Sequence, residues 1–531
     1  MPLFRSFLSI AFSIAALLAL PSLAFAAGIK ILVKPHLAAR ISSVGHSHAG
    51  KLSSVPVRVD FELLKNARRF RIITASGRSM FGRKRKALPK FSLFSDKRGK
   101  VYARTFSGQL RRPGEGNFGT FHLTAIKRAA GKPAIAGTFN SAPFSQNIHE
   151  NASGALELES YHTADMPDCA GDIDGKHIAH DSFPLALPNK LSSAAIDGAL
   201  TIDIAILLST EMVDAYGSLA AAQAEAINAV DAANGAYANS EIAQELRLVY
   251  AGQTTTVQDP AILEDLYRLQ DPTDGAFDEA HSIRDTYGAD LVSLFRHESD
   301  PTACGIAFTM NSGSISTDFA DHGFSAVTDI CATGNYSLAH ELGHNMGANH
   351  DVTNAGGQSA YSYSYGYQFT GSNNGKYRTV MAYASGQSGE VRIPYFSNPD
   401  VQYQGVATGT SSANNALTLN NTAAIVAAFR SESELSPEFP PAPTPTPTPA
   451  AISFKNVKSS LVKGKCKIVG TVKYVDGLVV SALPVELRTY SGTLLKTASS
   501  SSSGKFRFNA SRKKKYRLMV DSRLNRAVRC S

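Results

Sequence analysis

This chain has few long apolar runs and only five cysteines, and basic side chains are rare in residues 196–434. Beyond the first residues no segment approaches the roughly 20 apolar residues of a membrane-spanning helix, which argues against a transmembrane anchor. The five cysteines are an odd number, so they cannot all pair within one chain. Residues 451–531 have no aromatic platform of the kind that stacks bases, so we expect no dedicated nucleic-acid target.

The start of the chain has the pattern of a secretion signal. Arg5 is the one charge in the first 29 residues, residues 7–20 are mostly apolar, and residues 24–26 form a small-x-small cleavage site. The alternative is a transmembrane anchor, but Pro21 interrupts the apolar stretch before it reaches spanning length. We therefore expect a signal peptide over residues 1–26 and a secreted, extracellular protein.

One short stretch carries the spacing HExxHxxGxxH. Positions i and i+4 share one face of a helix, so His340 and His344 can bind the same ion, and Glu341 is placed to reach a metal-bound water. Gly347 can adopt the positive φ that ends a helix, which lets His350 supply a third nitrogen. Three protein ligands leave a fourth position for water, which indicates a catalytic zinc site. A bare HExxH occurs by chance in many proteins, whereas the full pattern is far more specific.

This motif resembles that of the metzincin zinc endopeptidases, whose second mark is a Met-turn beneath the metal. Residues 379–383, Thr-Val-Met-Ala-Tyr, are similar to that turn. The resemblance covers roughly residues 196–434 and implies a zinc endopeptidase. Further positions similar to the reprolysin (adamalysin) branch, and to its secreted bacterial members, are Asn345, Asp351 and the segments 304–307, 331–335 and 392–399.

The resemblance also implies a fold and roles for further residues. The fold would be α/β (α+β), with a mixed twisted sheet and a zinc helix, and the periodicities of residues 202–208 and 219–238 agree with a strand and a helix. Met381 would support the histidines without touching the metal. Tyr383 would either bind zinc or the oxyanion, or be a packed aromatic. Residues 324–328, the strand before the zinc helix, would be the sheet edge to which substrate adds as an antiparallel strand.

Export would place the cysteines in an oxidising compartment, where pairing is expected. We expect Cys304 to pair with Cys331 across the stretch before the zinc helix, and Cys466 to pair with Cys530 as a staple of the last segment. Cys169 is then left over. It is either a buried or intermolecular cysteine or a cysteine switch, in which a thiolate takes the open position of zinc and keeps the zymogen inert.

Charge divides the chain into blocks that its net +9 hides. Residues 27–195 hold 26 Lys and Arg against 12 Asp and Glu, a net +14, and residues 196–434 hold 8 against 28, a net −20. A basic propeptide and an acidic enzyme attract, so we expect the propeptide to dock on the enzyme. The alternative is that each set of charges only solvates its own surface.

Three further regions flank the expected catalytic domain over residues 196–434. Residues 27–195 predict a mainly β propeptide, with strand-like alternation at 57–63 and 70–74. Residues 435–450 form an extended Pro/Thr linker. Residues 451–531 predict a small β-sandwich, which resembles the carboxypeptidase regulatory-like domains. With 18 basic against 3 acidic residues, a net +15, this domain is expected to bind anionic cell-surface polymers.

Basic side chains are rare in the expected catalytic domain, yet Lys376, Arg378 and Arg392 all lie around the Met-turn. In the metzincins the chain after that turn forms the wall of the pocket for the residue that follows the cut bond. This part also resembles the bacterial peptidyl-Asp metallopeptidases. We therefore expect cleavage before Asp, with Arg392 as the first candidate partner of the carboxylate and Arg378 as the second. The alternative is that these residues face solvent or pair with Glu390 or Asp400.

Together these features predict a secreted zinc endopeptidase made as a zymogen, with one catalytic Zn²⁺. Glu341 would act as general base, taking a proton from water and delivering it to the departing amine. The partners would be protein or peptide substrates and the protein's own propeptide. The sequence does not decide whether a structural Ca²⁺ ion is also bound, and it assigns no residues to one. The alternative function is a cell-surface adhesin on a non-catalytic metalloprotease scaffold, which the intact glutamate and histidines disfavour.

Overall fold

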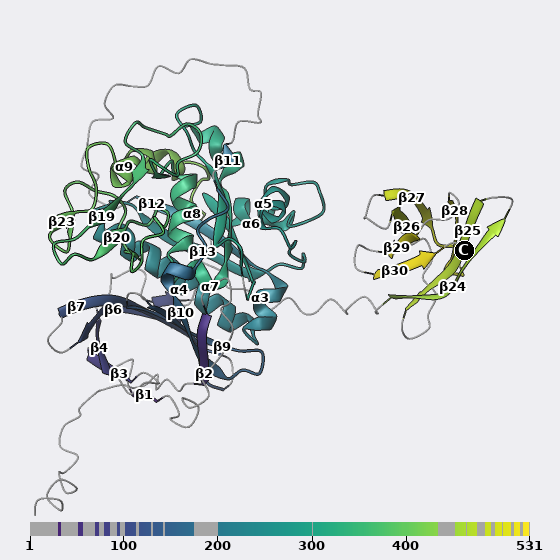
Figure 1. Ribbon diagram of the computed structural model, residues 1–531, viewed down its shortest axis with the longest axis horizontal. Coiled ribbons are helices and arrows are strands. Elements are labelled where there is room, and N and C mark those ends of the chain that lie inside the picture. Colours follow the sequence, from purple (N-terminus) through teal and green to yellow (C-terminus); the bar gives the residue numbers. More distant parts are fainter. Residues whose placement is uncertain are drawn as a thin grey trace, which may run out of the picture. The chain divides into compact units, whose positions relative to one another are not determined.

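The computed structural model describes most of residues 101–174, 200–433 and 452–529, together with short strands before residue 101. By its contacts the chain divides into one unit over Met1–Pro441 and a second over Ala442–Ser531, and each is described by itself (Figure 1). Within the described segments, no helix combines the length and apolarity needed to cross a membrane. The expected signal peptide and Pro/Thr linker lie outside the described residues.

A six-stranded sheet forms the centre of the first unit, in the order β11-β15-β16-β14-β12-β13. Strand β15 runs antiparallel to β16, whereas the other pairings are parallel, so the expected mixed α/β sheet is confirmed. The apolar runs of the central strands are buried, as is usual for parallel strands covered on both faces. The strands are β11 (Ile173–Asp174), β12 (Thr201–Leu208), β13 (Glu245–Gln253), β14 (Leu291–Arg296), β15 (Gly305–Thr309) and β16 (Phe324–Thr328).

The expectation that residues 324–328 form the sheet edge is wrong. Strand β16 lies between β15 and β14, and β15 in turn lies between β16 and β11, a short strand from the N-terminal region. The chain leaves β15, passes through the 3₁₀ helix η3 (Thr317–His322) and returns as β16 on the inner side. Order along the chain therefore differs from order across the sheet.

The helices pack around this sheet. Helix α4 begins after Ser218, whose side chain caps the backbone N–H of Ala221, and its alanine-rich surface lets it lie between two sheets (Figure 1). It contacts β13 on one side and β7 and β8 of the N-terminal region on the other. The helices are α3 (Thr210–Ala215), α4 (Leu219–Asn239), α5 (Ile262–Gln270), α6 (Glu279–Tyr287), α7 (Asp329–Ala332), α8 (Ser337–Asn345) and α9 (Asn415–Val426).

Short strands follow the zinc-motif helix and shape the region around it. In the parallel pair β20–β21, Arg378 lies opposite Arg392, so two arginines far apart in the sequence become neighbours. These strands are β17 (Asn349–Asp351), β18 (Tyr365–Gly366), β19 (Gln368–Thr370), β20 (Lys376–Arg378), β21 (Val391–Arg392), β22 (Gln402–Tyr403) and β23 (Val406–Ala407).

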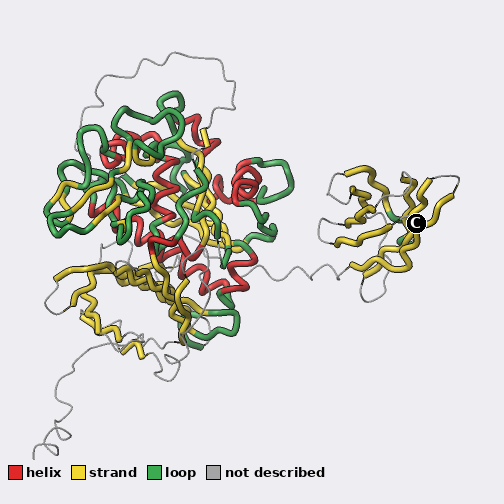
Figure 2. The backbone as a smooth tube through the Cα atoms, in the orientation of Figure 1, coloured by secondary structure: helices red, strands yellow, loops and turns green. Residues whose placement is uncertain are grey.

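The N-terminal region forms a large, mainly antiparallel sheet beneath the catalytic region (Figure 2). The hydroxyl of Tyr336 forms hydrogen bonds with the side chains of Thr120 and Asn140 of this sheet, at 2.9 and 3.0 Å. Nδ1 of His122 lies 2.8 Å from a carboxylate oxygen of Asp231 of α4. The strand expected at residues 57–63 lies outside the described residues. The strands are β1 (Lys30–Leu32), β2 (Lys51–Pro56), β3 (Arg69–Ile73), β4 (Ser79–Lys84), β5 (Leu93–Ser95), β6 (Val101–Arg112), β7 (Gly116–Ile126), β8 (Ala134–Ser141), β9 (Phe144–Glu150) and β10 (Leu156–His162).

The second unit contains two sheets, in the orders β24-β25-β28 and β27-β26-β29-β30. Alternating apolar residues of both sheets share one core, in which Ile468 and Phe508 of the first sheet join Leu487 and Leu518 of the second. The strands are β24 (Ile452–Val462), β25 (Lys465–Tyr474), β26 (Pro484–Thr489), β27 (Leu494–Ser499), β28 (Lys505–Ala510), β29 (Lys515–Val520) and β30 (Leu524–Arg529).

Candidate active site

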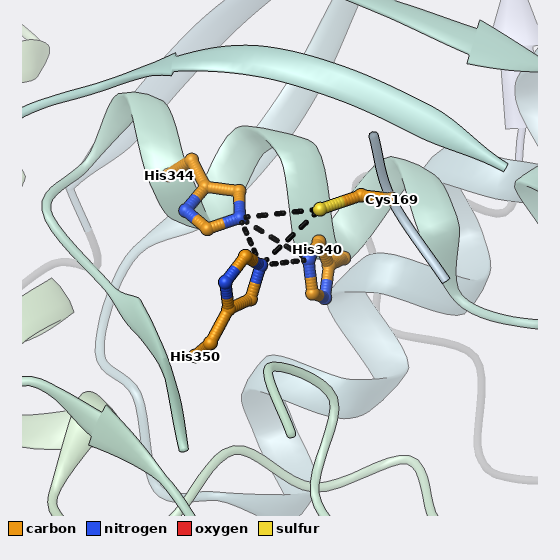
Figure 3. Close-up of side chains that lie close together, drawn as sticks. All are labelled: Cys169, His340, His344 and His350. Atoms are coloured by element: carbon orange, nitrogen blue, oxygen red, sulfur yellow. Dashed lines mark hydrogen bonds between the residues drawn. The ribbon is translucent and has the colours of Figure 1, made fainter. Parts of the chain in front are cut away.

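Three histidines converge at the C-terminal end of α8 (Figure 3). His340 and His344 are one turn apart on the helix and both are buried. The helix ends at Asn345, and Gly347 takes a φ of +90°, which a residue with a side chain rarely adopts. This turn leads the chain into β17, where His350 points back at the other two rings.

The Nε2 atoms of these histidines lie 2.9–3.1 Å from one another. The opposite ring nitrogen of His340 donates to the carbonyl of Val380 at 2.8 Å, and that of His344 donates to the carbonyl of Ala348 at 3.1 Å. In a neutral imidazole this places the lone pair on Nε2, so the shared centre is lined with electron pairs. A cation at that centre would remove their mutual repulsion.

The residues present fit a zinc ion. A tetrahedral zinc with Zn–N bonds of about 2.0–2.1 Å holds its nitrogens about 3.3 Å apart, close to the spacing here. Burial, reinforced by the neighbouring histidines, holds the pKa of His340 well below its ordinary value, so the imidazole stays neutral as a metal ligand must. The carbonyl partners of the two helical rings fix their orientation.

A fourth donor comes from the N-terminal region. The sulfur of Cys169 lies 3.2 Å from Nε2 of His350 and 4.0 Å from Nε2 of His344, and the four donor atoms fall within 4.8 Å of one another. Cys169 lies in the segment between β10 and β11, beyond the 3₁₀ helix η2 (Thr163–Asp165). The described geometry therefore brings the left-over cysteine to the open side of the three histidines.

Glu341 is fully buried next to this centre. A Cβ atom added to Gly305 would lie 2.4 Å from its Oε1, so the carboxylate rests against the start of β15 at a place where only glycine fits. The glutamate side chain thus contacts the first residue of β15. The importance of Gly305 follows from this contact, and its sequence signal was its place in segment 304–307, which resembles the secreted bacterial reprolysin-like proteins.

Met381 lies against the zinc-motif helix. It is fully buried, and a Cβ atom on Gly343 would lie 2.8 Å from its sulfur. The close approach explains why glycine occupies the position before His344. In the same turn, the backbone N–H of Tyr383 donates to Asp351 at 3.1 Å, which links the turn to the residue after the third histidine.

Tyr383 lies beside the open position. Its hydroxyl is 2.7 Å from the sulfur of Cys169 and donates to the carbonyl of the same residue at 3.1 Å, while its ring centre is 4.1 Å from that of His350. Burial, together with the charges of Cys169 and Glu341, raises the pKa of Tyr383 far above its ordinary value. The hydroxyl therefore keeps its proton and can act as a hydrogen-bond donor at this position.

Arg378 and Arg392 are buried, with side chains 2% and 4% exposed, rather than facing solvent. Both guanidinium groups bind Asp168, at 2.7 and 2.9 Å, and both donate to the carbonyl of Ala382. The carboxylate of Glu390 instead accepts from the backbone and side chain of Ser385. For Arg378 and Arg392, the alternatives of solvent exposure and of pairing with Glu390 or Asp400 are therefore wrong, since among the described residues both pair with Asp168.

Burial of Asp168 favours its neutral form, but the charges of Arg378 and Arg392 outweigh this and lower its pKa. Burial, with the neighbouring Arg378, lowers the pKa of Arg392 to about 10, which leaves it charged at neutral pH. Sequence reasoning missed Asp168. Its position directly before the left-over cysteine was the one signal that could have drawn attention to it.

Cys304 and Cys331 form the expected disulfide, whose half-cystines are 27 residues apart. Tyr161 and Met166 of the N-terminal region pack on it in a small apolar cluster. Cys466 is buried in the second unit, and Cys530, its expected partner, lies outside the described residues.

Residues 199–416 match the family described as metallo-peptidase family M12B, reprolysin-like. A peptidyl-Asp metalloendopeptidase of Stenotrophomonas maltophilia (strain R551-3) is 35% identical over 241 residues, which are 45% of this chain and 55% of that protein. One of Xanthomonas campestris pv. campestris is 36% identical over 240 residues, 45% of this chain and 54% of that protein. The chain thus spans about half the length of the curated relatives it matches.

Likeness to solved structures is weaker. A chain in the structure of a chaperone-substrate complex has a TM-score of 0.34 and 22% identity, covering 44% of this chain and 36% of that one.

Proposed function

Because residues 199–416 form a reprolysin-like metallopeptidase domain, we propose that this protein is a secreted zinc endopeptidase made as a zymogen. The observation that carries the proposal is the convergence of three Nε2 atoms within 3.1 Å, with Glu341 buried beside them. Relatives named peptidyl-Asp metalloendopeptidases support the same class of reaction.

His340, His344 and His350 would hold the zinc ion through Nε2. A bound zinc ion would act as a Lewis acid that lowers the pKa of water and polarises a peptide carbonyl. Glu341 takes the proton of the attacking water and then delivers it to the departing amine. The hydroxyl of Tyr383, which keeps its proton, donates a hydrogen bond toward the oxygen on which negative charge develops.

The cut falls on the amino side of Asp. Arg378 and Arg392 form a buried cationic site near the metal centre, where both guanidinium groups can bind one oxygen of a carboxylate while the backbone N–H of Ala384 binds the other. A neutral side chain in this pocket would leave two buried charges without an anion, which is strongly unfavourable. The names of the curated relatives agree with this preference.

Cys169 keeps the precursor latent as a cysteine switch. A thiolate is a strong zinc ligand, and bound there it would exclude the water that Glu341 needs. The opposite net charges of the two regions, +14 for residues 27–195 and −20 for residues 196–434, favour the docked arrangement. Maturation then requires cleavage between Cys169 and Thr201, and the residues around Lys190 lie outside the described part of the chain.

The C-terminal domain binds anionic polymers of cell surfaces and brings the enzyme close to its substrates. Its support is the excess of 18 basic over 3 acidic residues in positions 451–531.

Hydrolysis of casein by the processed protein tests the proposal. We expect turnover that stops on chelation, returns with added zinc and is lost in Glu341→Gln, while that variant still binds one zinc ion per chain. A processed protein that binds zinc but cleaves neither casein nor gelatin would instead favour the adhesin alternative. Metal analysis of His344→Ala, which should bind zinc far more weakly, is the matching control for the ligand set.

A further inference from the structure

Asp168 carries the most informative contact outside the zinc motif. We infer that the propeptide places Asp168 in the pocket that receives the acidic residue of the substrate, so that latency rests on an imitated substrate carboxylate as well as on the Cys169 thiol. This inference rests on the proposed preference for Asp, and it assigns Asp168 a role in inhibition and selectivity together.

The contacts of Asp168 are those of a bound ligand. Its Oδ1 accepts from Arg378 at 2.7 Å and from Arg392 at 2.9 Å, and its Oδ2 accepts from the backbone N–H of Ala384 at 3.0 Å. All three donors belong to the catalytic domain, and the Asp168 side chain is 18% exposed. The carboxylate is thus saturated by charge-assisted hydrogen bonds from a domain that it leaves on maturation.

The two arginines have no comparable partner of their own. Among the described residues, Asp168 is the carboxylate that forms an ion pair with either guanidinium; their other bonds go to the carbonyls of Asn335 and Ala382. Removal of the propeptide would therefore leave two buried cations without an anion. A substrate carboxylate restores the balance, which makes the pocket selective for acidic residues in the mature enzyme and a docking site for Asp168 in the precursor.

The direction of the propeptide explains why it inhibits without being a good substrate. The backbone N–H of Cys304 donates to the carbonyl of Asp168 at 3.1 Å, and that of Ala170 donates to the carbonyl of Gly305 at 2.9 Å. Beyond these bonds β11 continues parallel to β15. The segment therefore runs from the arginine pocket to the metal centre.

A substrate cut before Asp must run the other way, because its Asp follows the bond that lies at the metal. The propeptide thus fills the same two subsites in reverse, with Asp168 in the acidic pocket and the Cys169 thiol, rather than a peptide bond, at the metal. Met166 anchors the preceding residues on the Cys304–Cys331 disulfide.

The reactivity of the Cys169 thiol toward iodoacetamide tests this in the intact precursor. The full-length chain carries Glu341→Gln, so that it cannot cut itself, and is compared with and without Asp168→Asn. We expect alkylation at Cys169 to become at least about tenfold faster in Asp168→Asn, because the charge-assisted bonds that hold the segment closed are weakened. The increase should persist after chelation, since the arginine contacts need no metal.

Asp165→Asn is the matched control, because Asp165 lies three residues earlier with its side chain 51% exposed, and its alkylation rate should equal that of the parent. Asp168→Glu should give an intermediate alkylation rate, because it keeps the negative charge but places it on a side chain that is one methylene longer. Equal rates for Asp168→Asn and Asp165→Asn would overturn the inference.

A second measurement does not depend on folding of the variant precursor. A synthetic peptide of residues 164–174 should inhibit the processed enzyme in competition with an Asp-containing substrate, and the same peptide with Asp168→Asn should inhibit at least about tenfold more weakly. Equal inhibition by both peptides, with an enzyme that cuts before Asp, would overturn the inference and leave the proposed function standing. An enzyme that cuts before apolar residues would also overturn it, whereas the absence of any hydrolysis would contradict the proposed function itself.

Discussion

The sulfur of Cys169 lies 3.2 Å from Nε2 of His350, although the two residues are 181 positions apart in the chain. The contact places a soft ligand beside the three histidine rings and the hydroxyl of Tyr383. One short segment of the N-terminal region thus reaches both the metal centre and the arginine pocket.

Cys169→Ala should give a precursor that is active without processing or that cleaves itself early, because the metal's fourth position is then open to water. Hydrolysis of an Asp-containing peptide, measured before and after processing, would detect this. Since Asp168 still binds its arginines, the additional change Asp168→Asn should raise precursor activity further. A folded Cys169→Ala precursor that stays as latent as the parent would show that the thiol is not the switch, and would leave docking through charge as the inhibitor.

Gly305→Ala should reduce kcat roughly tenfold to a hundredfold, because the added Cβ would displace the carboxylate of Glu341 by a fraction of an ångström or more. Zinc content should change little, whereas thermal stability should fall, because the added Cβ would also lie 2.7 Å from Cγ and Cδ of a fully buried side chain. Gly313→Ala, whose added Cβ would lie 3.3 Å from the nearest atom, is the control. Unchanged kcat in Gly305→Ala would mean that the exact position of Glu341 does not limit the reaction.

The excised propeptide should inhibit the mature enzyme in trans, and salt should weaken this inhibition. The two regions carry +14 and −20, and attraction between exposed charges falls as the Debye length shortens. We expect the inhibition constant to rise roughly tenfold between about 0.05 and 0.5 M salt. An inhibition constant that does not depend on salt would count against electrostatic docking and would assign the affinity to the short-range contacts of Asp168 and Cys169.

Glu225 should make stability depend on pH. Burial raises the pKa of the Glu225 carboxyl from 4.5 to about 8, although the hydrogen bond from Thr333 lowers it. Between these two pH values the folded protein keeps the carboxyl proton that the unfolded chain loses. The neutral carboxyl therefore stabilises the fold fully below the unfolded pKa, and this contribution is lost as pH rises toward about 8.

In the Glu341→Gln precursor, Glu225→Gln should thus raise the melting temperature at pH 8 relative to its parent, and do so less at pH 5. Differential scanning calorimetry at both pH values would measure the difference. An equal change at both would show that Glu225 does not titrate between them.

The cluster of three histidines could be predicted from the sequence because its parts are local. His340, His344 and His350 fall within one short stretch, and helix geometry plus one glycine turn is enough to bring them together. The strand at residues 202–208 and the helix at residues 219–238 were likewise readable, since each has a strong periodicity of its own.

The order of the strands across the sheet could not be read in the same way. Whether β15 or β16 lies next to β14 depends on a contact between segments far apart that no local pattern encodes. Asp168 was missed for a related reason, because its partners Arg378 and Arg392 are 210 and 224 residues away. The arginines themselves were noticed only because basic residues are so rare around them.

Sequencing the new N-termini in a protein digest tests the central claim most directly. With the processed wild-type chain we expect Asp to dominate the first position of the new fragments. Arg392→Ala should lose this preference while keeping its zinc, whereas Lys376→Ala, a change at the third basic residue near the Met-turn, should keep it. New N-termini dominated by Leu, Phe or Val in the wild type would contradict the account of the arginine pocket.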